Sequence, residues 1–570
     1  MYLNFKVQIP KLKGKISRQS TRSGTYIHYV LERSYDPQKK HTVPRRVLIG
    51  KCVDETETMF PNENFLVYFP NAILPEARET ARRCRTLMAG SCIVIDRIVE
   101  EYGLGTMLQK HFHDQVGLVL DLAASMIIEE ENEDLCFRDY AYRHPLFSKD
   151  LRMEGDAAMF SFLSSVTSDQ ISGFLNDWSA KRDHRTRIYI SCNAEYQNSE
   201  AGDVGFVEAG NARVDLGHPI LRVGVAFDKT NQEPLFYECC PGSINDVSQF
   251  KLLADEAIAR RFRRIGFILD RGSYSRDCSA WMGEHDYAFI MMVKGSALFA
   301  AGLVDKVHGS FENRADASLR ELCICGITEK MKLFPEDTKE RYFHFFFDPM
   351  RMAEERRDLE TALTLMQKSF EQCIGRRVDF GAPHADYFDA RYDDRGCFLC
   401  AEEKKDAIEA AYSRCGYFCI ITSEKMDAED AYRLYHGRDA SEKLLSAAKP
   451  LQVCSGIRMH SAEVVSANIF IKFIALIIRQ RIYNLLKDEK IQLPDKRDCM
   501  TVSEAIRELE KVELVQINDG RYQLDHAFTS MQEIILKSFG ITKEQVASQA
   551  AALSGALGRQ EGRHGDRETV

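Results

Sequence analysis

Several signatures of common enzyme classes are missing from this chain of 570 residues. It contains no phosphate-binding loop and no dinucleotide fingerprint, which argues against a nucleotide cofactor. No local motif of a nucleophilic Ser or Cys is present either. The most apolar segment, residues 469–478, contains Lys472 and is followed by Arg479 and Arg481. It is too short and too interrupted to span a bilayer, so we expect a buried core helix and no membrane partner.

Cysteine pairing is not indicated, although the chain has 17 Cys. They are scattered and no secretory signal begins the sequence, so we expect reduced thiols in a cytoplasmic protein. Cys397-x2-Cys400 followed by Cys415-x3-Cys419 could hold a tetrahedral zinc ion. The second pair departs from the usual spacing, and Cys419 lies in an apolar run that predicts a buried strand. Small core residues are therefore favoured over a zinc site.

The charge of the chain is distributed unevenly. Residues 1–51 contain 12 Lys or Arg and two acidic residues, whereas the whole chain carries a net charge of −9. A basic arm on an acidic body is typical of nucleic-acid binding. Alternating residues at 24–32 and 45–50, separated by a polar turn at 35–40, predict a β-hairpin. Basic strands with Tyr side chains could lie along phosphates, and the alternative is a solvated basic sheet without a ligand.

Apolar periodicity predicts a mixed order of elements after this arm. Residues 92–108 and 116–128 have helical spacing, and the following Glu129–Glu131 is expected to be a solvated helix end. Strand patterns then predominate, with one helix among them. The predicted strands cover residues 188–196, 219–227, 234–239, 264–270 and 287–293, and the helix covers residues 245–263. This order predicts an α/β domain.

One set of polar residues stands out near the C-terminal end, Tyr435-x2-Arg438-x3-Glu442-x6-Lys449. On an α-helix these four side chains fall within an arc of roughly 60°. A carboxylate flanked by two cations and a phenol suits an oxygen-ligated metal ion beside a phosphate backbone. The alternative is a solvated helix face that carries ion pairs three and four residues apart.

A second motif, Asp270-Arg271-Gly272-Ser273-Tyr274, follows the apolar run at residues 265–269. With the set at residues 435–449, it resembles the motifs of DDE transposases of bacterial insertion sequences, in the group with a Y-(2)-R-(3)-E-(6)-K signature. The resemblance covers most of residues 1–490. It implies an RNase H-like core in which two Asp and one Glu hold two divalent metals, Mg²⁺ or Mn²⁺.

The resemblance also implies residue roles. Asp270 and Glu442 would be catalytic metal ligands, Arg438 and Lys449 would grip phosphates near the cut, and Tyr435 would pack against the DNA strand. The expected activity is cleavage at the element ends and joining of the 3′-OH to target DNA. The expected partners are terminal inverted repeats, target DNA and further copies of this chain. The expected location is the cytoplasm of a bacterium, in association with the nucleoid.

The first catalytic Asp of the family pattern is not matched. The equivalent strand is residues 188–196, in which Asn193 occupies the Asp position. An amide offers a metal one neutral oxygen but not the negative charge that binds Mg²⁺. Glu195 points to the same strand face as Asn193, and Asp203 is a more distant substitute. Three hypotheses therefore stay open: an active transposase, a degenerate copy that binds DNA without cutting it, and an unrelated nuclease with an RNase H-like core.

The expected architecture is an α/β fold with an RNase H-like catalytic core, an inserted domain, a basic N-terminal β-rich segment and a helical region. The insertion is expected because the interval between Asp270 and Glu442 is too long for an unstructured loop. The predicted segments are a basic β-rich DNA-binding segment at 1–70, a helical domain at 71–182, the first part of the core at 183–300, an inserted mixed domain at 301–415, the second part of the core with the Glu442 helix at 416–490, a small helical segment at 491–548 and a disordered tail at 549–570.

Overall fold

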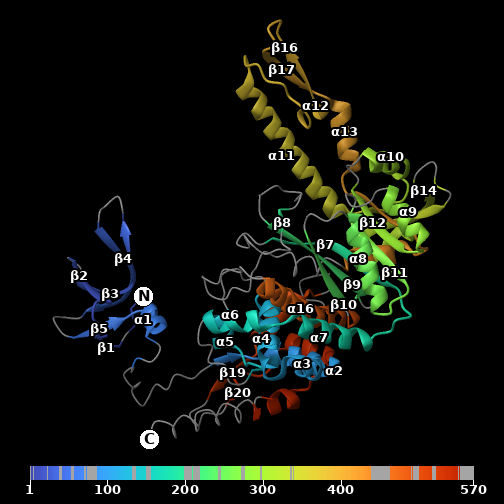
Figure 1. The fold of residues 1–570 in the computed structure, drawn as a ribbon. Coiled ribbons are helices and arrows are strands. Elements are labelled where there is room, and N and C mark those ends of the chain that lie inside the picture. The colour runs from blue at the N-terminus through green and yellow to red at the C-terminus, as the bar shows by residue number, and fades with distance from the viewer. Residues whose placement is uncertain are drawn as a thin grey trace. The chain divides into compact units, whose positions relative to one another are not determined.

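The computed structural model shows a mixed α/β fold and describes most of residues 2–552 (Figure 1). Besides shorter breaks, the stretches outside the described residues are 73–85, 131–136, 149–155, 198–207, 210–218, 271–275, 438–461, 492–499 and 553–570. The chain divides into two compact units, Met1–Arg85 and Thr86–Val570. The finer domain boundaries expected from the sequence stay predictions.

The first unit is a five-stranded antiparallel sheet in the order β1-β5-β4-β3-β2, with one short helix. Its elements are β1 (Val7–Gln8), β2 (Ile16–Thr21), β3 (Gly24–Asp36), β4 (His41–Cys52), β5 (Thr58–Pro61) and α1 (Glu63–Tyr68). The predicted hairpin is confirmed by the pairing of β3 with β4. Ile27, Ile49 and Met59 on one face of the sheet are fully buried and pack with Phe65 of α1. This small core holds the unit together.

Helices form the first part of the second unit, as the sequence predicts. They are α2 (Gly90–Tyr102), α3 (Leu104–Phe112), α4 (Val116–Ile128), α5 (Phe137–Arg143), α6 (Asp156–Ser165) and α7 (Ser168–Ala180), with a 3-10 turn at His113–Gln115. The pattern at 92–108 is divided at Gly103, whose φ of +62° is a left-handed conformation that glycine adopts readily. The predicted core helix is confirmed within α16 (Ala462–Asp488), where Lys472 is only 2% exposed.

The acidic run after α4 begins with two carboxylates that are not a solvated helix end, Glu129 and Glu130, which corrects the expectation, whereas Glu131 lies outside the described residues. The Glu130 carboxylate accepts two hydrogen bonds from the Arg479 guanidinium, both 3.0 Å long. Glu129 lies 3.7 Å from an Arg143 nitrogen. Burial raises the pKa of Glu129 to about 7. Long-range partners on α5 and α16 attract these carboxylates, and the local sequence does not reveal such partners.

The second unit is organised around a large sheet in the order β10-β9-β7-β11-β12-β18-β15-β14-β13, with β8 beside β9 (Figure 1). Strands β7, β11 and β12 are parallel, and the other pairs are antiparallel. The strands are β7 (Ile188–Gln197), β8 (Glu208–Ala209), β9 (Pro219–Asp228), β10 (Pro234–Pro241), β11 (Ile265–Asp270), β12 (Ala288–Lys294), β13 (Ser318–Leu319), β14 (Ile324–Lys332), β15 (Glu340–Phe347) and β18 (Tyr417–Thr422). The five strands predicted after the helical region are thereby confirmed as β7, β9, β10, β11 and β12.

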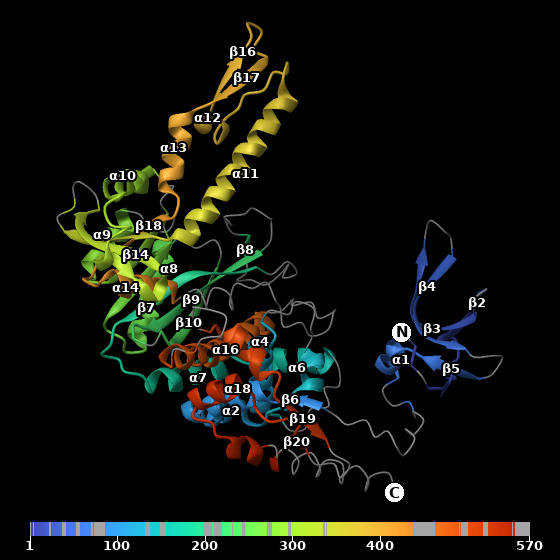
Figure 2. The same ribbon diagram turned by 180° about the vertical axis from the view of Figure 1, so that it is seen from behind.

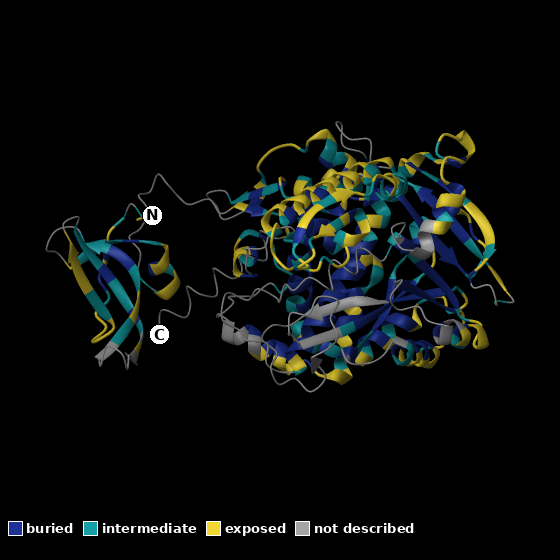
Figure 3. Cartoon of the chain, turned by 90° about the horizontal axis from the view of Figure 1, so that it is seen from above, coloured by how far each residue is buried: buried dark blue, intermediate teal, exposed yellow. Residues whose placement is uncertain are grey.

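Helices cover both faces of this sheet. The helices involved are α8 (Asp246–Ala259), α9 (Arg276–Glu284), α10 (Leu298–Val307) and α14 (Ala428–His436). Phe267 of β11 shares one core with residues of α8, α9 and α10, and Ile268 on the other face shares a core with α14. Buried residues gather along the strands of this unit (Figure 3). The far end of the sheet packs on the helical bundle, where the Tyr237 and Phe473 rings are 5.1 Å apart.

The residues expected to form an inserted mixed domain, 301–415, belong to two parts of the structure, and the boundaries of that domain stay a prediction. Residues 318–347 add β13, β14 and β15 to the main sheet, because β15 pairs with β18. Residues 349–414 form a separate lobe with its own apolar cluster (Figures 1 and 2). Its elements are α11 (Pro349–Cys373), α12 (His384–Tyr387), β16 (Phe388–Tyr392), β17 (Phe398–Glu403) and α13 (Lys405–Arg414). In this lobe Cys400 is exposed, unlike the fully buried Cys419 of β18.

The C-terminal segment is mixed rather than helical. It contains α17 (Val502–Leu509), β19 (Glu513–Gln516), β20 (Tyr522–Leu524) and α18 (Ser530–Ser538). Strand β19 pairs with β6 (Thr86–Met88), from the opposite end of the unit, which explains why local patterns missed it. Gln549, at the start of the predicted disordered tail, donates a 3.4 Å hydrogen bond to Asp96. Within the described part of the chain, no helix is long and apolar enough to cross a membrane.

A buried histidine predicts acid sensitivity of the main sheet. The His344 ring on β15 is fully buried and lies 2.9 Å from the Thr328 hydroxyl and 3.0 Å from the Thr422 hydroxyl. Burial lowers the pKa of His344 to about 4, against a partial rise caused by Asp427. Between pH 6.5 and 4 the unfolded chain binds a proton that the folded chain does not. Acidification through this window should therefore lower the free energy of unfolding by about 3 kcal/mol.

The measurement is the urea midpoint of unfolding at pH 7.5 and at pH values down to about 4.5. His344→Gln keeps polar contacts with both threonines but cannot titrate in this range. Its midpoint should fall less on acidification than that of the unmodified protein. Equal falls in both proteins would show that His344 does not set the acid sensitivity.

Candidate functional site

The central parallel strand β11 ends at Asp270. The apolar side chains that precede Asp270 in this strand are at most 2% exposed. They are those of Ile265, Phe267, Ile268 and Leu269. A parallel strand covered by helices on both faces requires such a continuous apolar run. Asp270 pairs with Met292 of β12, and its side chain lies outside the described residues. The carboxyl edge of a parallel sheet is where α/β proteins bind their ligands.

Asn193 lies in the neighbouring strand β7, toward the same edge of the sheet. The parallel register between β7 and β11 runs to the pair Ser191 and Ile268. Asn193 and Asp270 each follow two residues later in their strands, so their backbones reach the same edge of the sheet. The side chains of residues 192–197, Glu195 included, lie outside the described residues.

A β-bulge occurs at this point of β7. Ser191 pairs with Val225 of β9 and Ala194 pairs with Val223, so Cys192 and Asn193 together oppose Gly224. A Cβ at Gly224 would come within 2.6 Å of Leu253 on α8, which leaves room only for glycine unless Leu253 moves. Bulges change the direction of a strand and are frequent beside functional sites. The bulge was not predicted from the sequence, although Gly224 inside a strand pattern is a signal for one.

Tyr435 is the member of the four-residue signature that lies within the described part of the chain. It is 4% exposed and belongs, with Leu434 of α14, to the apolar cluster that contains Tyr189 and Ile268. The ring that we expected beside DNA is therefore packed against the sheet. The spacing of Ala431, Leu434 and Tyr435 is that of a buried helix face and was a readable signal.

The remaining predicted site residues lie outside the described residues. They are Arg438, Glu442, Lys449 and Asp203. Helix α14 ends at His436 and contains Tyr435. The expectation that one helix face carries all four signature residues therefore stays a prediction. Among described residues, no group of His, Cys, Asp and Glu is arranged to hold a metal ion.

The turn between β9 and β10 holds the end of α14. The Gln232 side-chain amide donates a 2.7 Å hydrogen bond to the carbonyl of Arg433 in the last turn of the helix. A Cβ at Gly437 would come within 2.1 Å of the same amide group. Gln232 has a φ of +53°, an uncommon conformation for a residue other than glycine. The turn therefore fixes the point at which the chain leaves α14 toward Glu442.

Contacts with the helical bundle support this turn. The carboxylate of Glu233, next to Gln232, lies 3.2 Å from the Arg182 guanidinium and accepts a hydrogen bond from the Tyr102 hydroxyl. Arg182 in turn lies 3.7 Å above the Trp178 ring centroid. The position of α14 thus depends on packing between the sheet and the bundle.

Removing the Gln232 amide should loosen the end of α14. Gln232→Ala deletes one hydrogen bond worth about 1 kcal/mol, so amide hydrogens at residues 433–437 should exchange about fivefold faster. Hydrogen–deuterium exchange with peptide mass spectrometry measures this effect. Gln367→Ala is the control, because Gln367 pairs with Glu403 in the separate lobe. Unchanged exchange at 433–437 would show that Gln232 does not hold the helix.

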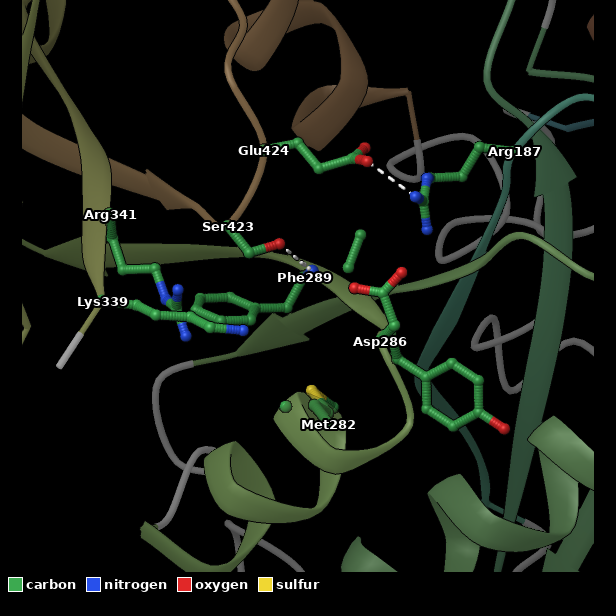
Figure 4. Close-up of a pocket in the computed structure, with 11 residues that line it drawn as sticks. Arg187, Met282, Asp286, Phe289, Lys339, Arg341, Ser423 and Glu424 are labelled. Carbon is green, nitrogen blue, oxygen red and sulfur yellow. Dashed lines mark hydrogen bonds and ion pairs between the residues drawn. The ribbon is translucent and has the colours of Figure 1, made fainter. Parts of the chain in front are cut away.

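A pocket lies at the opposite edge of the sheet (Figure 4). Its lining includes the Arg187–Glu424 ion pair, with atoms 2.6 Å apart, and the cations Lys339 and Arg341. Phe289, at the start of β12, also lines it, whereas Asp270 pairs with Met292 near the end of that strand. This pocket is therefore separate from the edge that carries Asp270 and Asn193.

Among solved structures, the chain is similar to "Cryo-EM structure of piggyBac transposase synaptic complex with hairpin DNA (SNHP)", with 8% identity and a TM-score of 0.29, over 81% of this chain and 82% of that one. No curated protein matches the chain. Residues 203–478 match the family model described as "Transposase DDE domain". This segment includes Asp270 and Glu442, and Asn193 precedes it. This match covers a little under half of the chain.

Proposed function

We propose that the chain is an insertion-sequence transposase that binds the ends of its element and catalyses metal-dependent DNA cleavage and strand transfer. The observation that carries the proposal is the placement of Asp270 at the end of a buried central strand, inside a segment similar to the transposase DDE domain. Asn193, on the adjacent strand β7, would occupy the position of the first catalytic Asp. Membership of the bacterial group with the Y-(2)-R-(3)-E-(6)-K signature is part of this proposal.

The order of strands supports an RNase H-like core. Strands β10, β9 and β7 form an antiparallel meander, and the parallel strands β11 and β12 follow on the other side of β7. Helix α8 makes the crossover between β10 and β11. In this interpretation β13, β14, β15 and β18 extend the core sheet, and residues 349–414 are the inserted domain.

The donor set fits a divalent metal in kind but not fully in charge. Asp270 and Glu442 offer carboxylate oxygens and Asn193 an amide oxygen, and oxygen ligands are those that Mg²⁺ and Mn²⁺ prefer. A site of two carboxylates and one neutral amide carries one negative charge fewer than a site of three carboxylates. When bound, the metal would activate the attacking oxygen and stabilise the leaving oxygen of a phosphodiester.

The other residues of the proposed site would bind and position DNA. Arg438 and Lys449 carry charges that suit phosphate contacts. Tyr435, buried against β7 and β11, would hold the helix from which the Glu442 segment departs. The basic first unit would bind DNA as well. Pairing two element ends would require at least two copies of the chain.

A second function is favoured by one residue. Because Asn193 lacks the charge of the expected Asp, the chain could bind element ends without cutting them. Such a protein would compete with active copies for the same DNA.

The test is cleavage of a linear duplex that carries the element's own ends, in Mg²⁺, in Mn²⁺ and in a chelator. We expect strand cleavage at the element ends that either metal supports and the chelator stops. Binding of the ends without cleavage in either metal would favour the binding protein. If the ends bind no better than unrelated DNA of equal length, the transposase assignment fails.

A further inference from the structure

The solvent face of the first unit carries a row of aromatic and basic side chains. Tyr26 of β3 pairs with Lys51 of β4, and Lys51 pairs with Phe60 of β5. Paired residues on neighbouring strands project from the same face of a sheet. The buried Ile27 and Met59 mark the opposite face as the core side. Tyr26, Lys51 and Phe60 are each partly exposed, so the row lies on the outer face.

Each ring in this row has an ammonium group over it. The Lys51 nitrogen lies 5.7 Å from the centroid of the Tyr26 ring, and the Lys6 nitrogen lies 5.8 Å from the centroid of the Phe60 ring. Tyr2 is a further aromatic side chain of the unit and is 37% exposed. Rings and cations therefore alternate across three neighbouring strands.

The described charges of the first unit have one dominant sign. The exposed side chains of the unit include seven further cations, and the described acidic side chains are those of Glu57 and Glu63. The seven are Lys11, Lys13, Lys15, Arg18, Arg33, Arg45 and Arg46. Glu57 is itself paired with Lys11 at 2.9 Å. The ligand that complements such a surface is an anion that also presents flat apolar faces.

We propose that this face binds single-stranded nucleic acid, with unpaired bases stacked on Tyr26 and Phe60 and phosphates on Lys6 and Lys51. A duplex buries the faces of its bases, so it cannot use the two rings in this way, whereas a single strand can. Tyr26 and Phe60 lie two strands apart, about 10 Å, so they meet different bases. The proposal deepens the DNA binding proposed for the first unit and rests on it, but it does not depend on cleavage.

Fluorescence anisotropy of the full chain tests the proposal. The probes are a labelled oligothymidylate and a labelled duplex of equal length. Tyr26→Leu and Phe60→Leu should each weaken binding of the single strand about tenfold and change binding of the duplex by less than about twofold. Tyr26→Trp keeps a stacking surface and should bind the single strand at least as well as the unmodified protein. The control is Tyr68→Leu, which removes a 38% exposed ring from α1 and should have no effect.

The lysines give an independent readout. Lys51→Gln should reduce the slope of log affinity against log salt concentration by about 0.7 for the single strand, because one phosphate contact is lost. Tyr26→Leu should leave that slope unchanged. Equal losses for the single strand and the duplex, or loss in Tyr26→Trp as well, would overturn the proposal in favour of a structural role. If the protein binds the duplex and the ring substitutions do not change single-strand binding, this inference is rejected and the proposed function is not.

Discussion

Asn193→Asp is expected to raise the rate of DNA cleavage at the element ends by about 100-fold or more. The substitution adds the missing negative charge on β7, the strand beside Asp270, and keeps the number of side-chain heavy atoms unchanged. The charge should tighten binding of a divalent metal and offset the repulsion that an anionic phosphate meets. The measurement is the single-turnover rate of cleavage in saturating Mg²⁺.

The control for this prediction changes an amide to a carboxylate elsewhere. Asn176 accepts a 2.7 Å hydrogen bond from Arg260, and an Asp at that position can accept the same bond. Asn176→Asp should therefore leave the cleavage rate unchanged. If Asn193→Asp cuts no faster than the unmodified protein, Asn193 is not at the position of a metal ligand, or Glu195 or Asp203 already supplies the charge.

Asp270→Ala is expected to lower cleavage by about 1000-fold or more, to background, in the Asn193→Asp protein. Asp270 ends the central strand and is proposed to be a ligand that Asn193→Asp cannot replace. Affinity for the DNA ends, measured in a chelator, should change by less than about threefold, because the basic residues that bind phosphates remain. A loss of cleavage with intact binding separates a catalytic role from unfolding.

The matched control is Asp255→Ala, which removes an exposed carboxylate from helix α8. It should cut DNA at the rate of its parent. Substantial cleavage by the Asp270→Ala protein would place the metal ligands elsewhere in the chain.

The elements at the centre of the sheet were the most predictable from the sequence. Strand β11 was readable because burial on both faces demands an uninterrupted apolar run, and the β9–β10 hairpin was readable from its polar turn. Helix α4 matched its apolar pattern at both ends. In each case a local pattern reflects the environment of the whole element.

Pairing between distant segments could not be read in the same way. Strand β15 contains a run of aromatic residues, but its place beside β18 depends on partners 70 to 80 residues away along the chain. For the same reason β19, which pairs with β6, was missed.

In the candidate site, two features that were not predicted had local signals in the sequence. The spacing of Ala431, Leu434 and Tyr435 indicates a buried helix face, and Gly224 indicates the bulge opposite Asn193. The contact between Gln232 and the end of α14 had none, because it joins a turn to a helix far along the chain.

The most direct test of the central claim is whether positions 193 and 270 belong to one metal site. Mn²⁺ affinity, measured by electron paramagnetic resonance, would be compared in four proteins: unmodified, Asn193→Asp, Asp270→Ala and the double variant. We predict that Asn193→Asp tightens Mn²⁺ binding about tenfold when Asp270 is present and has little effect when it is absent. An equal effect in both backgrounds would mean that the two positions do not share a metal ion, and would contradict the account.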